Sequence, residues 1–166
     1  MNGKIIFLNG TSSAGKSTIA KALRAKLDPT FCYYASDQLA DEGFRPIDPA
    51  TRLATRQQFF DGFHRSIPAL ASAGIDLLIE HIVEEQAWAD DLAKLLEGLD
   101  VFWVGIHAPI EAIEQREKSR GNRTIGEARF HLKTHGFCRY DVEVDSTHPV
   151  DEVTTKIVAA WKNRKR

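Results

Sequence analysis

One segment near the N-terminus constrains this chain more than any other feature. Residues 10–17 read GTSSAGKS and match the pattern G-x-x-x-x-G-K-[ST] without a mismatch. An apolar run, Lys4–Asn9, precedes the segment, and a helical pattern over Lys16–Leu27 follows it. In this order the glycines let backbone N–H groups turn inward, and the helix N-terminus attracts anions. The sequence therefore predicts a P-loop that holds the phosphates of a nucleotide.

Each part of this loop has an expected role. Lys16 should reach the β- and γ-phosphates of ATP, and the Ser17 hydroxyl should ligate Mg²⁺. ATP and Mg²⁺ are therefore the predicted cofactors. The predicted nucleotide-binding residues of the loop are Gly10, Thr11, Ser12, Ser13, Ala14, Gly15, Lys16, Ser17 and Thr18.

The rest of the chain alternates short apolar runs with longer amphipathic segments, which is typical of βαβ units around a parallel sheet. Further strands are expected over residues 31–35, 75–79, 100–107 and 142–144, and further helices over residues 49–72, 87–96, 110–119 and 150–162. The predicted fold class is α/β. We expect a three-layer P-loop NTPase fold, with a five-stranded parallel sheet and helices on both faces, in one domain spanning residues 1–166.

Composition excludes several classes of partner. The chain is 43% hydrophobic and 27% charged with a net charge of -1, which is ordinary for a globular protein and indicates neither nucleic acid nor membrane binding. No apolar stretch approaches the ~20 residues of a membrane span. Cys32 and Cys138 are too far apart for a zinc or redox motif, so two reduced thiols are expected. We expect a cytoplasmic protein, and its oligomeric state is not predicted.

Polar residues stand at or just past the expected carboxyl ends of the strands. In doubly wound sheets ligands bind at that edge. These residues are Asp37, Glu80, His81, His107 and Asp145. They place the candidate chemistry on one edge of the sheet.

Three of these residues carry competing interpretations. Asp37 is the candidate base for an acceptor hydroxyl, but it could also cap a helix that begins near Gln38, and both can hold at once. Glu80 could orient a water bound to Mg²⁺, as a Walker-B acid does. His81 is favoured as a structural group rather than a catalyst.

The acceptor side must decide the reaction, because a P-loop fixes only the nucleotide. A GTPase would need an N-K-x-D segment, and none exists here. A small-molecule kinase needs a base and a lid of arginines over the γ-phosphate. Arg116, Arg120 and Arg123 surround a helix end that breaks at Gly121, and they predict such a lid over about residues 116–134. The alternative is a solvated helix end whose charges complement the helix dipole.

The site prediction follows from these residues. The expected catalytic residues are Lys16, Asp37, Arg120 and Arg123, and Arg116 and Arg120 are also expected to contact the nucleotide. Ser17 directly, and Glu80 through water, are expected at the metal. Two further hypotheses stay open: a metabolite kinase of the nucleotide, sugar or shikimate type, and an ATP-binding switch without an acceptor.

Four stretches resemble chloramphenicol 3-O-phosphotransferase and its relatives. They are residues 8–17 with the P-loop, residues 99–105 (LDVFWVG), residues 116–123 (REKSRGNR) and residues 140–148 (YDVEVDSTH). Asp37 also falls where that family has its acidic acceptor-side residue. The resemblance covers most of the chain up to about His148 and is weakest in the middle.

The resemblance implies an ATP-dependent kinase that phosphorylates a small-molecule hydroxyl, with antibiotic resistance as a possible role. Asp37 would take the acceptor proton, the lid arginines would hold phosphates, and the loop Asp145–Thr147 would lie near the adenine. The sequence departs from the family at His81, where a second acid is expected, and at Asn122 in the lid. Residues 41–60, which should line the acceptor pocket, show little of the family pattern.

Aromatic residues are expected near this pocket. Phe59, Phe60, Phe63 and His64 lie on the long predicted helix, and Trp88 lies on the next. An aromatic wall would suit a flat acceptor, but helical spacing favours the core for most of them. Arg52, Arg56 and Arg65 are candidates for contacts with polar acceptor groups.

Overall fold

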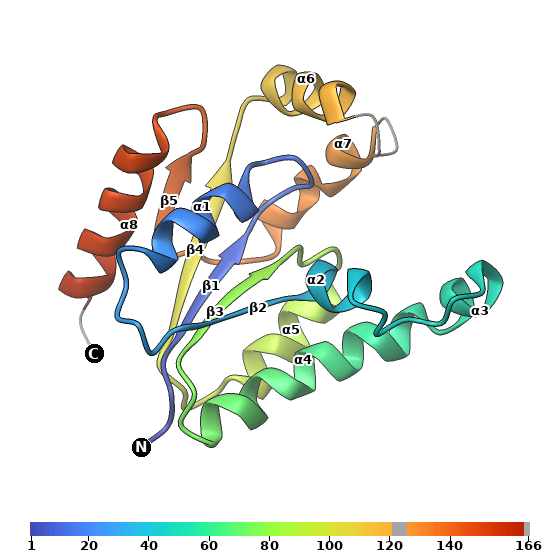
Figure 1. The fold of residues 1–166 in the computed structure, drawn as a ribbon, viewed down its shortest axis with the longest axis horizontal. Coiled ribbons are helices and arrows are strands. Elements are labelled where there is room, and N and C mark those ends of the chain that lie inside the picture. The colour runs from blue at the N-terminus through green and yellow to red at the C-terminus, as the bar shows by residue number, and fades with distance from the viewer. Residues whose placement is uncertain (121–125, 165–166) are drawn as a thin grey trace.

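The computed structural model describes residues 1–120 and 126–164, except the side chain of residue 120. A five-stranded parallel sheet lies at its centre, in the order β2-β3-β1-β4-β5 (Figure 1). The strands are β1 (Ile5–Asn9), β2 (Cys32–Ala35), β3 (Leu77–His81), β4 (Val101–His107) and β5 (Val142–Asp145). The predicted α/β sandwich with five parallel strands is confirmed.

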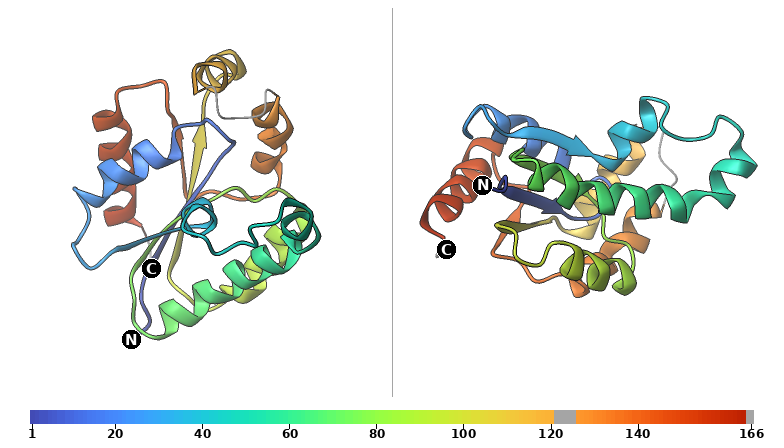
Figure 2. Two further views of the ribbon diagram at one scale, coloured as in Figure 1. Left: turned by 45° about the vertical axis from the view of Figure 1, so that its right-hand side comes forward. Right: turned by 90° about the horizontal axis from the view of Figure 1, so that it is seen from below.

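Helices cover both faces of the sheet (Figure 2). On one face lie α1 (Lys16–Arg24) and α8 (Val150–Asn163), and on the other lie α4 (Arg56–Ser72) and α5 (Gln86–Leu95). The remaining helices lie near the carboxyl edge or beyond it: α2 (Ser36–Asp41), α3 (Pro49–Ala54), α6 (Ile110–Arg120), α7 (Glu127–His131) and the 3-10 helix η1 (Leu132–Gly136).

The central strand β1 explains how the two hydrophobic cores form. All five of its residues are buried. Successive side chains of a strand point to opposite faces, so Ile6 and Leu8 pack with α1 and α8, whereas Ile5 and Phe7 pack with α4 and α5. The strand that leads into the P-loop is therefore held from both sides.

The predicted helix over residues 49–72 is two helices. Thr55 has φ −102° and ψ 12°, and its N–H and hydroxyl both donate to the carbonyl of Thr51. Such side-chain bonds compete with a continuing helix. In consequence α3 lies on an arm away from the sheet (Figure 1), and Leu53 is 75% exposed rather than part of the core. Apolar spacing alone does not reveal this break.

The third strand, Leu77–His81, lies two residues beyond the expected range of residues 75–79. Glu80 pairs with Leu8, and His81 pairs with Asn9, in the parallel register with β1. Both polar residues are therefore the last members of β3 rather than loop residues. Glu80 and His81 were expected at or just past the end of this strand, and backbone pairing with β1 includes both.

Tyr140 packs against Gly105 of β4, where no side chain fits. A Cβ atom at Gly105 would lie 2.6 Å from Cδ2 of the Tyr140 ring. We expect Gly105→Ala to lower the free energy of unfolding by about 1–3 kcal/mol, because the ring must move. At Gly62 of α4 nothing lies within 4 Å of such an atom, so Gly62→Ala should raise it by up to about 1 kcal/mol. Urea denaturation of both variants measures this, and equal effects would contradict the packing argument.

Candidate active site

The P-loop lies between β1 and α1, as predicted. Gly15 precedes α1 in the left-handed region, with φ +91°. At Gly10 a Cβ atom would lie 2.4 Å from the carbonyl oxygen of Ile106, so the close approach of the loop to β4 requires glycine there. The first turn of α1 carries no acidic residue, which leaves its N-terminal partial charge available to an anion.

Polar atoms of the loop are poised for a ligand. Lys16 Nζ donates to the carbonyl oxygens of Gly10, at 3.0 Å, and Thr11, at 2.8 Å. Among the residues that the structure describes, the buried hydroxyls of Ser12 and Ser13 have no hydrogen-bond partner. Buried polar groups are nearly always paired, so two unsatisfied hydroxyls in a glycine-rich turn indicate a polar ligand. Phosphate oxygens would meet that need.

The two residues expected at the metal lie together. Ser17 Oγ donates to Glu80 Oε1 at 2.7 Å, and the Tyr33 hydroxyl donates to the other carboxylate oxygen. Burial raises the pKa of Tyr33, and the Glu80 carboxylate raises it further, so this phenol remains a donor. Within the described chain no group of three or more His, Cys, Asp or Glu could hold a metal alone. A hydroxyl, a nearby carboxylate and phosphate oxygens are the ligands that Mg²⁺ takes in P-loop proteins.

A cavity of about 330 Å³ connects the P-loop to Asp37. Asp37 lies in the first turn of α2, just beyond β2. The helix-cap alternative is wrong for this residue, because Ala35 holds the N-cap position without a side-chain hydrogen bond. The cavity walls include Lys16, Ser17, Asp37, Phe60, Glu80 and His81.

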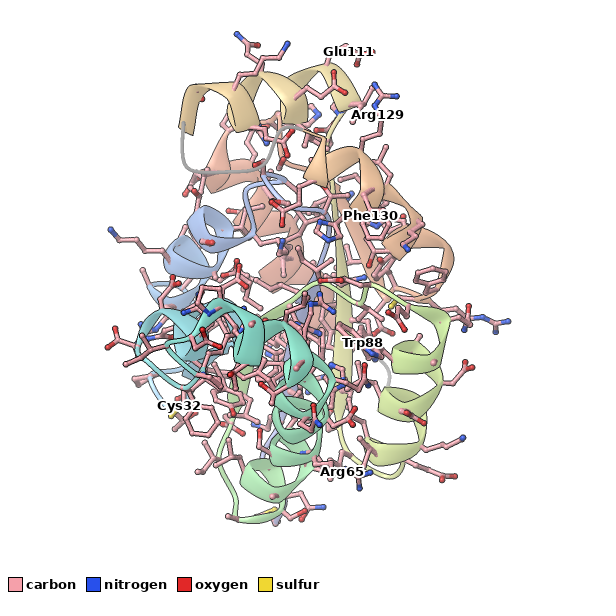
Figure 3. All side chains as sticks on the ribbon, turned by 90° about the vertical axis from the view of Figure 1, so that its right-hand side faces the viewer. Cys32, Arg65, Trp88, Glu111, Arg129 and Phe130 are labelled. Carbon is pink, nitrogen blue, oxygen red and sulfur yellow. The ribbon has the colours of Figure 1, made fainter. Side chains whose placement is uncertain are left out.

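Most of the aromatic residues belong to the core, as their spacing favours. Phe63 and Trp88 are buried. Trp88 of α5, labelled in Figure 3, lies with its ring centre 4.6 Å from that of Phe60. Of the aromatic residues expected near the pocket, Phe60 also lines the cavity, together with Tyr33. Phe59 is half-buried beneath the Arg45 guanidinium, 4.3 Å from the ring centre.

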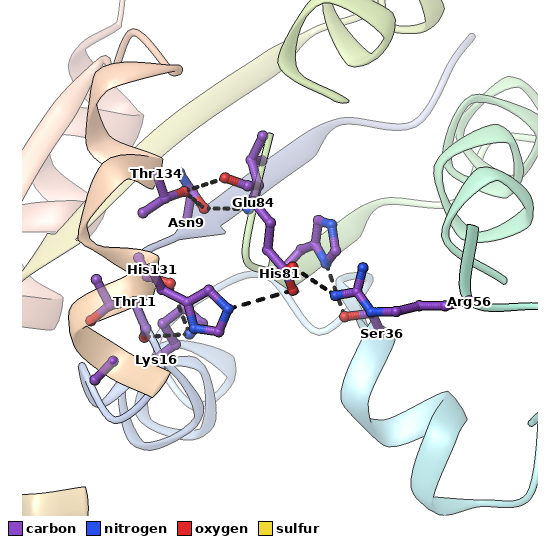
Figure 4. Close-up of polar contacts among 12 residues, drawn as sticks. Asn9, Thr11, Lys16, Ser36, Arg56, His81, Glu84, His131 and Thr134 are labelled. Atoms are coloured by element: carbon purple, nitrogen blue, oxygen red, sulfur yellow. Dashed lines mark hydrogen bonds and ion pairs between the residues drawn. The ribbon is translucent and has the colours of Figure 1, made fainter. Parts of the chain in front are cut away.

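Of the three arginines considered for the acceptor, Arg56 reaches a residue of the cavity wall. Its Nη2 lies 2.6 Å from Glu84 Oε2, and His131 Nε2 lies 3.6 Å from Glu84 Oε1 (Figure 4). Burial raises the pKa of Glu84, but the contacts with His131 and Arg56 outweigh burial and hold that pKa below its usual value. Arg65 is exposed on the outer side of α4, and Arg52 bonds to the arm before α3.

Sequence analysis did not identify two charged residues of this region: Glu84, which lines the cavity, and Arg45, which lies near Asp37. Burial lowers the pKa of Arg45, while the nearby Asp37 carboxylate raises it. Arg45 lies in the irregular segment between α2 and α3, and Glu84 follows β3 by three residues. Only the position of Glu84 just past a strand end was available as a signal.

Arg116 is the lid residue that the structure brings to the P-loop. Its Nη1 and Nη2 donate to the side-chain and backbone oxygens of Ser146, each at 3.0 Å. A Cβ atom at Gly15 would lie 3.7 Å from Arg116 Nη1. Arg123, with Gly121 and Asn122, lies outside the described residues, as does the side chain of Arg120.

A buried carboxylate organises the described part of the lid segment. Glu117 of α6 accepts hydrogen bonds from the backbone N–H groups of Gly126, at 2.8 Å, and Ala128, at 3.0 Å. These bonds satisfy free donors at the start of α7 and hold the pKa of Glu117 below its usual value. They fix α7 against α6.

The loop after β5 completes the surroundings of the P-loop. Asp145 Oδ1 accepts from the N–H and the hydroxyl of Thr147, at 2.8 and 2.7 Å, and these bonds lower the pKa of Asp145. Ser146 thereby faces Arg116 and Gly15. Its proximity to the adenine stays a prediction.

Comparison with known proteins decides the family. The model of chloramphenicol phosphotransferase-like proteins matches residues 3–162. The chain belongs to this family. It is therefore an enzyme of the kinase class, a nucleotide-binding phosphotransferase with a P-loop. This confirms the resemblance derived from the four stretches, and the switch without an acceptor has no support.

One sequence relative and two solved structures are similar to this family member over most of its length. A Mycobacterium tuberculosis protein named "Putative O-phosphotransferase" is 28% identical, over 96% of this chain and 83% of its own. The M. tuberculosis APS kinase, solved with AMPPNP and APS, has a TM-score of 0.70 at 18% identity, over 98% and 99% of the two chains. Shikimate kinase from Aquifex aeolicus has a TM-score of 0.66 at 16% identity, over 95% and 96% of the two chains.

Across the described part of this family member, no helix is both long and apolar enough to cross a bilayer.

A buried histidine gives the family member an acid sensitivity. Burial lowers the pKa of His64 to about 4, although Asp61 and Asp91 act in the opposite direction. An unfolded histidine titrates near 6.5, so between about pH 6.5 and 4 only the unfolded chain binds this proton. We expect the free energy of unfolding to fall by about 3 kcal/mol across that range from His64 alone.

Urea denaturation at pH 7 and pH 4.5 checks this. The fall should be smaller by about 2 kcal/mol in His64→Gln, which cannot titrate but keeps a polar atom near the Nε2 position. Equal falls in the two proteins would contradict the assignment.

Proposed function

We propose that the chain transfers the γ-phosphate of MgATP to a hydroxyl of a small molecule bound in the cavity between the P-loop and Asp37. The observation that carries this proposal is the cavity itself. Its walls join Lys16 and Ser17, at the phosphate end, to the Asp37 carboxylate. Its volume of about 330 Å³ lies at the lower end of the range for small-molecule sites, about 300–1,000 Å³.

The proposed roles follow the chemistry of each side chain. The P-loop N–H groups, Lys16 and the hydroxyls of Ser12 and Ser13 hold phosphate oxygens. Ser17 holds Mg²⁺, with Glu80 orienting a bound water. When bound, Mg²⁺ neutralises charge that develops on the phosphates. Arg116, with Arg120 and Arg123 from the lid over residues 116–134, supplies further positive charge.

Asp37 is the proposed general base. Its carboxylate accepts the proton of the acceptor hydroxyl while that oxygen bonds to the γ-phosphorus. The bond from that phosphorus to the β–γ bridging oxygen breaks, and ADP leaves with the bond's electron pair. The Asp37 side chain lines the same cavity as Lys16 and Ser17, which supports this role.

A product screen tests the proposal. The protein is incubated with MgATP and a panel of small alcohols that contains phenicols, sugars, nucleosides and shikimate, and mass spectrometry detects a gain of one phosphate. The family makes a phenicol the first candidate, and product from another alcohol would assign a metabolite kinase instead. ATP consumption that yields only inorganic phosphate with every alcohol would contradict the proposal. A mock purification from cells that do not express the protein, run in parallel, identifies product that arises from a contaminating kinase.

A further inference from the structure

A chain of three buried polar side chains leads away from the cavity wall. Ser36 Oγ lies 2.9 Å from His81 Nδ1, and His81 Nε2 lies 3.0 Å from His64 Nε2. Ser36, His81 and His64 are 4%, 3% and 3% exposed. Figure 4 shows the His81 ring between β3 and the start of α2, with a ring nitrogen directed at Ser36.

The surroundings of this chain are aromatic. The His81 ring is stacked on Trp88 at 5.7 Å between centres, and Phe63 and Phe60 lie 5.1 and 5.6 Å from it. Burial lowers the pKa of His81 well below its ordinary value, so this imidazole is neutral. A neutral imidazole has one donor and one acceptor nitrogen, and both nitrogens of His81 are engaged. Because an unpaired polar atom here is costly, the ring and its partners hold one arrangement.

The anchored residue, Ser36, comes directly before Asp37. Both lie in the first turn of α2, a helix of six residues without a side-chain cap. A helix this short is not stable by itself, so contacts with the rest of the protein must fix it. The Ser36–His81 hydrogen bond ties that turn to the last residue of β3, the strand beside the P-loop strand.

We infer that His81 is a positioning residue for phosphoryl transfer: through Ser36 it fixes the first turn of α2, and thereby the place of the Asp37 carboxylate across from the P-loop. This inference rests on the proposed role of Asp37. This role differs from that of a purely structural core histidine. Positioning Asp37 requires only Nδ1, the His81 nitrogen that faces Ser36.

Two substitutions of His81 separate its two nitrogens. Asn places a polar atom near the position of Nδ1 and can keep the bond to Ser36, whereas Gln places one near Nε2 and loses it. We expect His81→Gln and Ser36→Ala to lower kcat by about 10- to 100-fold, the cost of a misplaced catalytic group. His81→Asn should keep kcat within about threefold of wild type, a small loss on that scale. KM for MgATP should change less than about twofold in all three variants, since the P-loop is untouched and positioning of the base does not bind nucleotide.

Ser66→Ala is the matched control. Ser66 of α4 is half-buried, and its hydroxyl is hydrogen-bonded to the Tyr34 hydroxyl, at 2.8 Å, and donates to the carbonyl of Phe63, at 2.6 Å. Its loss should lower the urea midpoint of unfolding about as much as Ser36→Ala does, without changing kcat. Urea denaturation of every variant shows which are folded, and Ser36→Ala carries the test should His81→Gln not fold.

The kinetic readout is MgATP turnover. It is measured with the acceptor that the product screen identifies and, in parallel, without an acceptor, where water receives the phosphate. A wild type without turnover contradicts the proposed function, and the inference falls with it. An active wild type in which Ser36→Ala keeps its kcat contradicts the inference alone. A loss of kcat in His81→Asn as large as that in His81→Gln also contradicts the inference, because the bond to Ser36 would then not determine kcat.

Discussion

Replacing Asp37 by Asn is expected to lower the rate of phosphoryl transfer by about 10²- to 10⁴-fold, which is the usual contribution of a positioned base. The amide has the size and shape of the carboxylate but cannot accept the hydroxyl proton. Asp37 lies on α2, beyond the loop that holds phosphates, so MgATP should still bind. The rate is measured as phosphorylated product formed per minute, and binding by titration with a fluorescent ATP analogue.

Asp90→Asn is a suitable control for Asp37→Asn. Asp90 is an exposed residue of α5 whose carboxylate accepts a hydrogen bond from Gln86, at 2.8 Å. This variant should match the wild type in both measurements. Undiminished product formation by Asp37→Asn would remove Asp37 from the mechanism, and loss of MgATP binding would show that the carboxylate has a different role.

The second large effect is expected at Lys16. Lys16→Met should lower phosphoryl transfer by about 10²- to 10³-fold, because a positive donor aimed at the phosphates is lost. It also removes the Lys16 hydrogen bonds to the carbonyl oxygens of Gly10 and Thr11, so the free energy of unfolding should fall by about 1–3 kcal/mol. Activity and stability must therefore be measured separately.

A thermal-shift titration with MgATP separates the two effects of Lys16→Met. At a fixed ligand concentration, tighter binding stabilises a folded protein more, so the MgATP-dependent rise in Tm should be smaller in Lys16→Met than in the wild type. Lys21→Met, on an exposed position of the same helix, should retain the full rise and full activity. A lower starting Tm with an unchanged MgATP response would contradict the role of Lys16 at the phosphates.

The parts of the fold that depend on local sequence were predicted well. A buried strand, a glycine turn and a helix follow one another within residues 5–24, so apolar spacing and motif agree at each step. The pairing of Ser17 with Glu80 was also foreseeable, because parallel strands place their carboxyl ends at one edge.

The parts of the fold that depend on contacts between distant residues were not predicted. The helices α2 and α7 have six and five residues, which is too short for a periodic pattern. Arg45 reaches the surroundings of Asp37 only because an irregular segment folds back over Phe59. The bond between His81 and Ser36 joins residues 45 positions apart, and nothing in either local sequence indicates it.

Side chains of β1 belong to both hydrophobic cores, so substitutions in either core should affect this strand. A void opened under α8, or one opened under α5, reaches the same short strand, although the two lie on opposite sides of the sheet. The P-loop, which is proposed to bind the triphosphate, follows directly after that strand. Core substitutions far from any ligand should therefore weaken nucleotide affinity, and a survey of inactivating changes should recover both hydrophobic layers along with the loop.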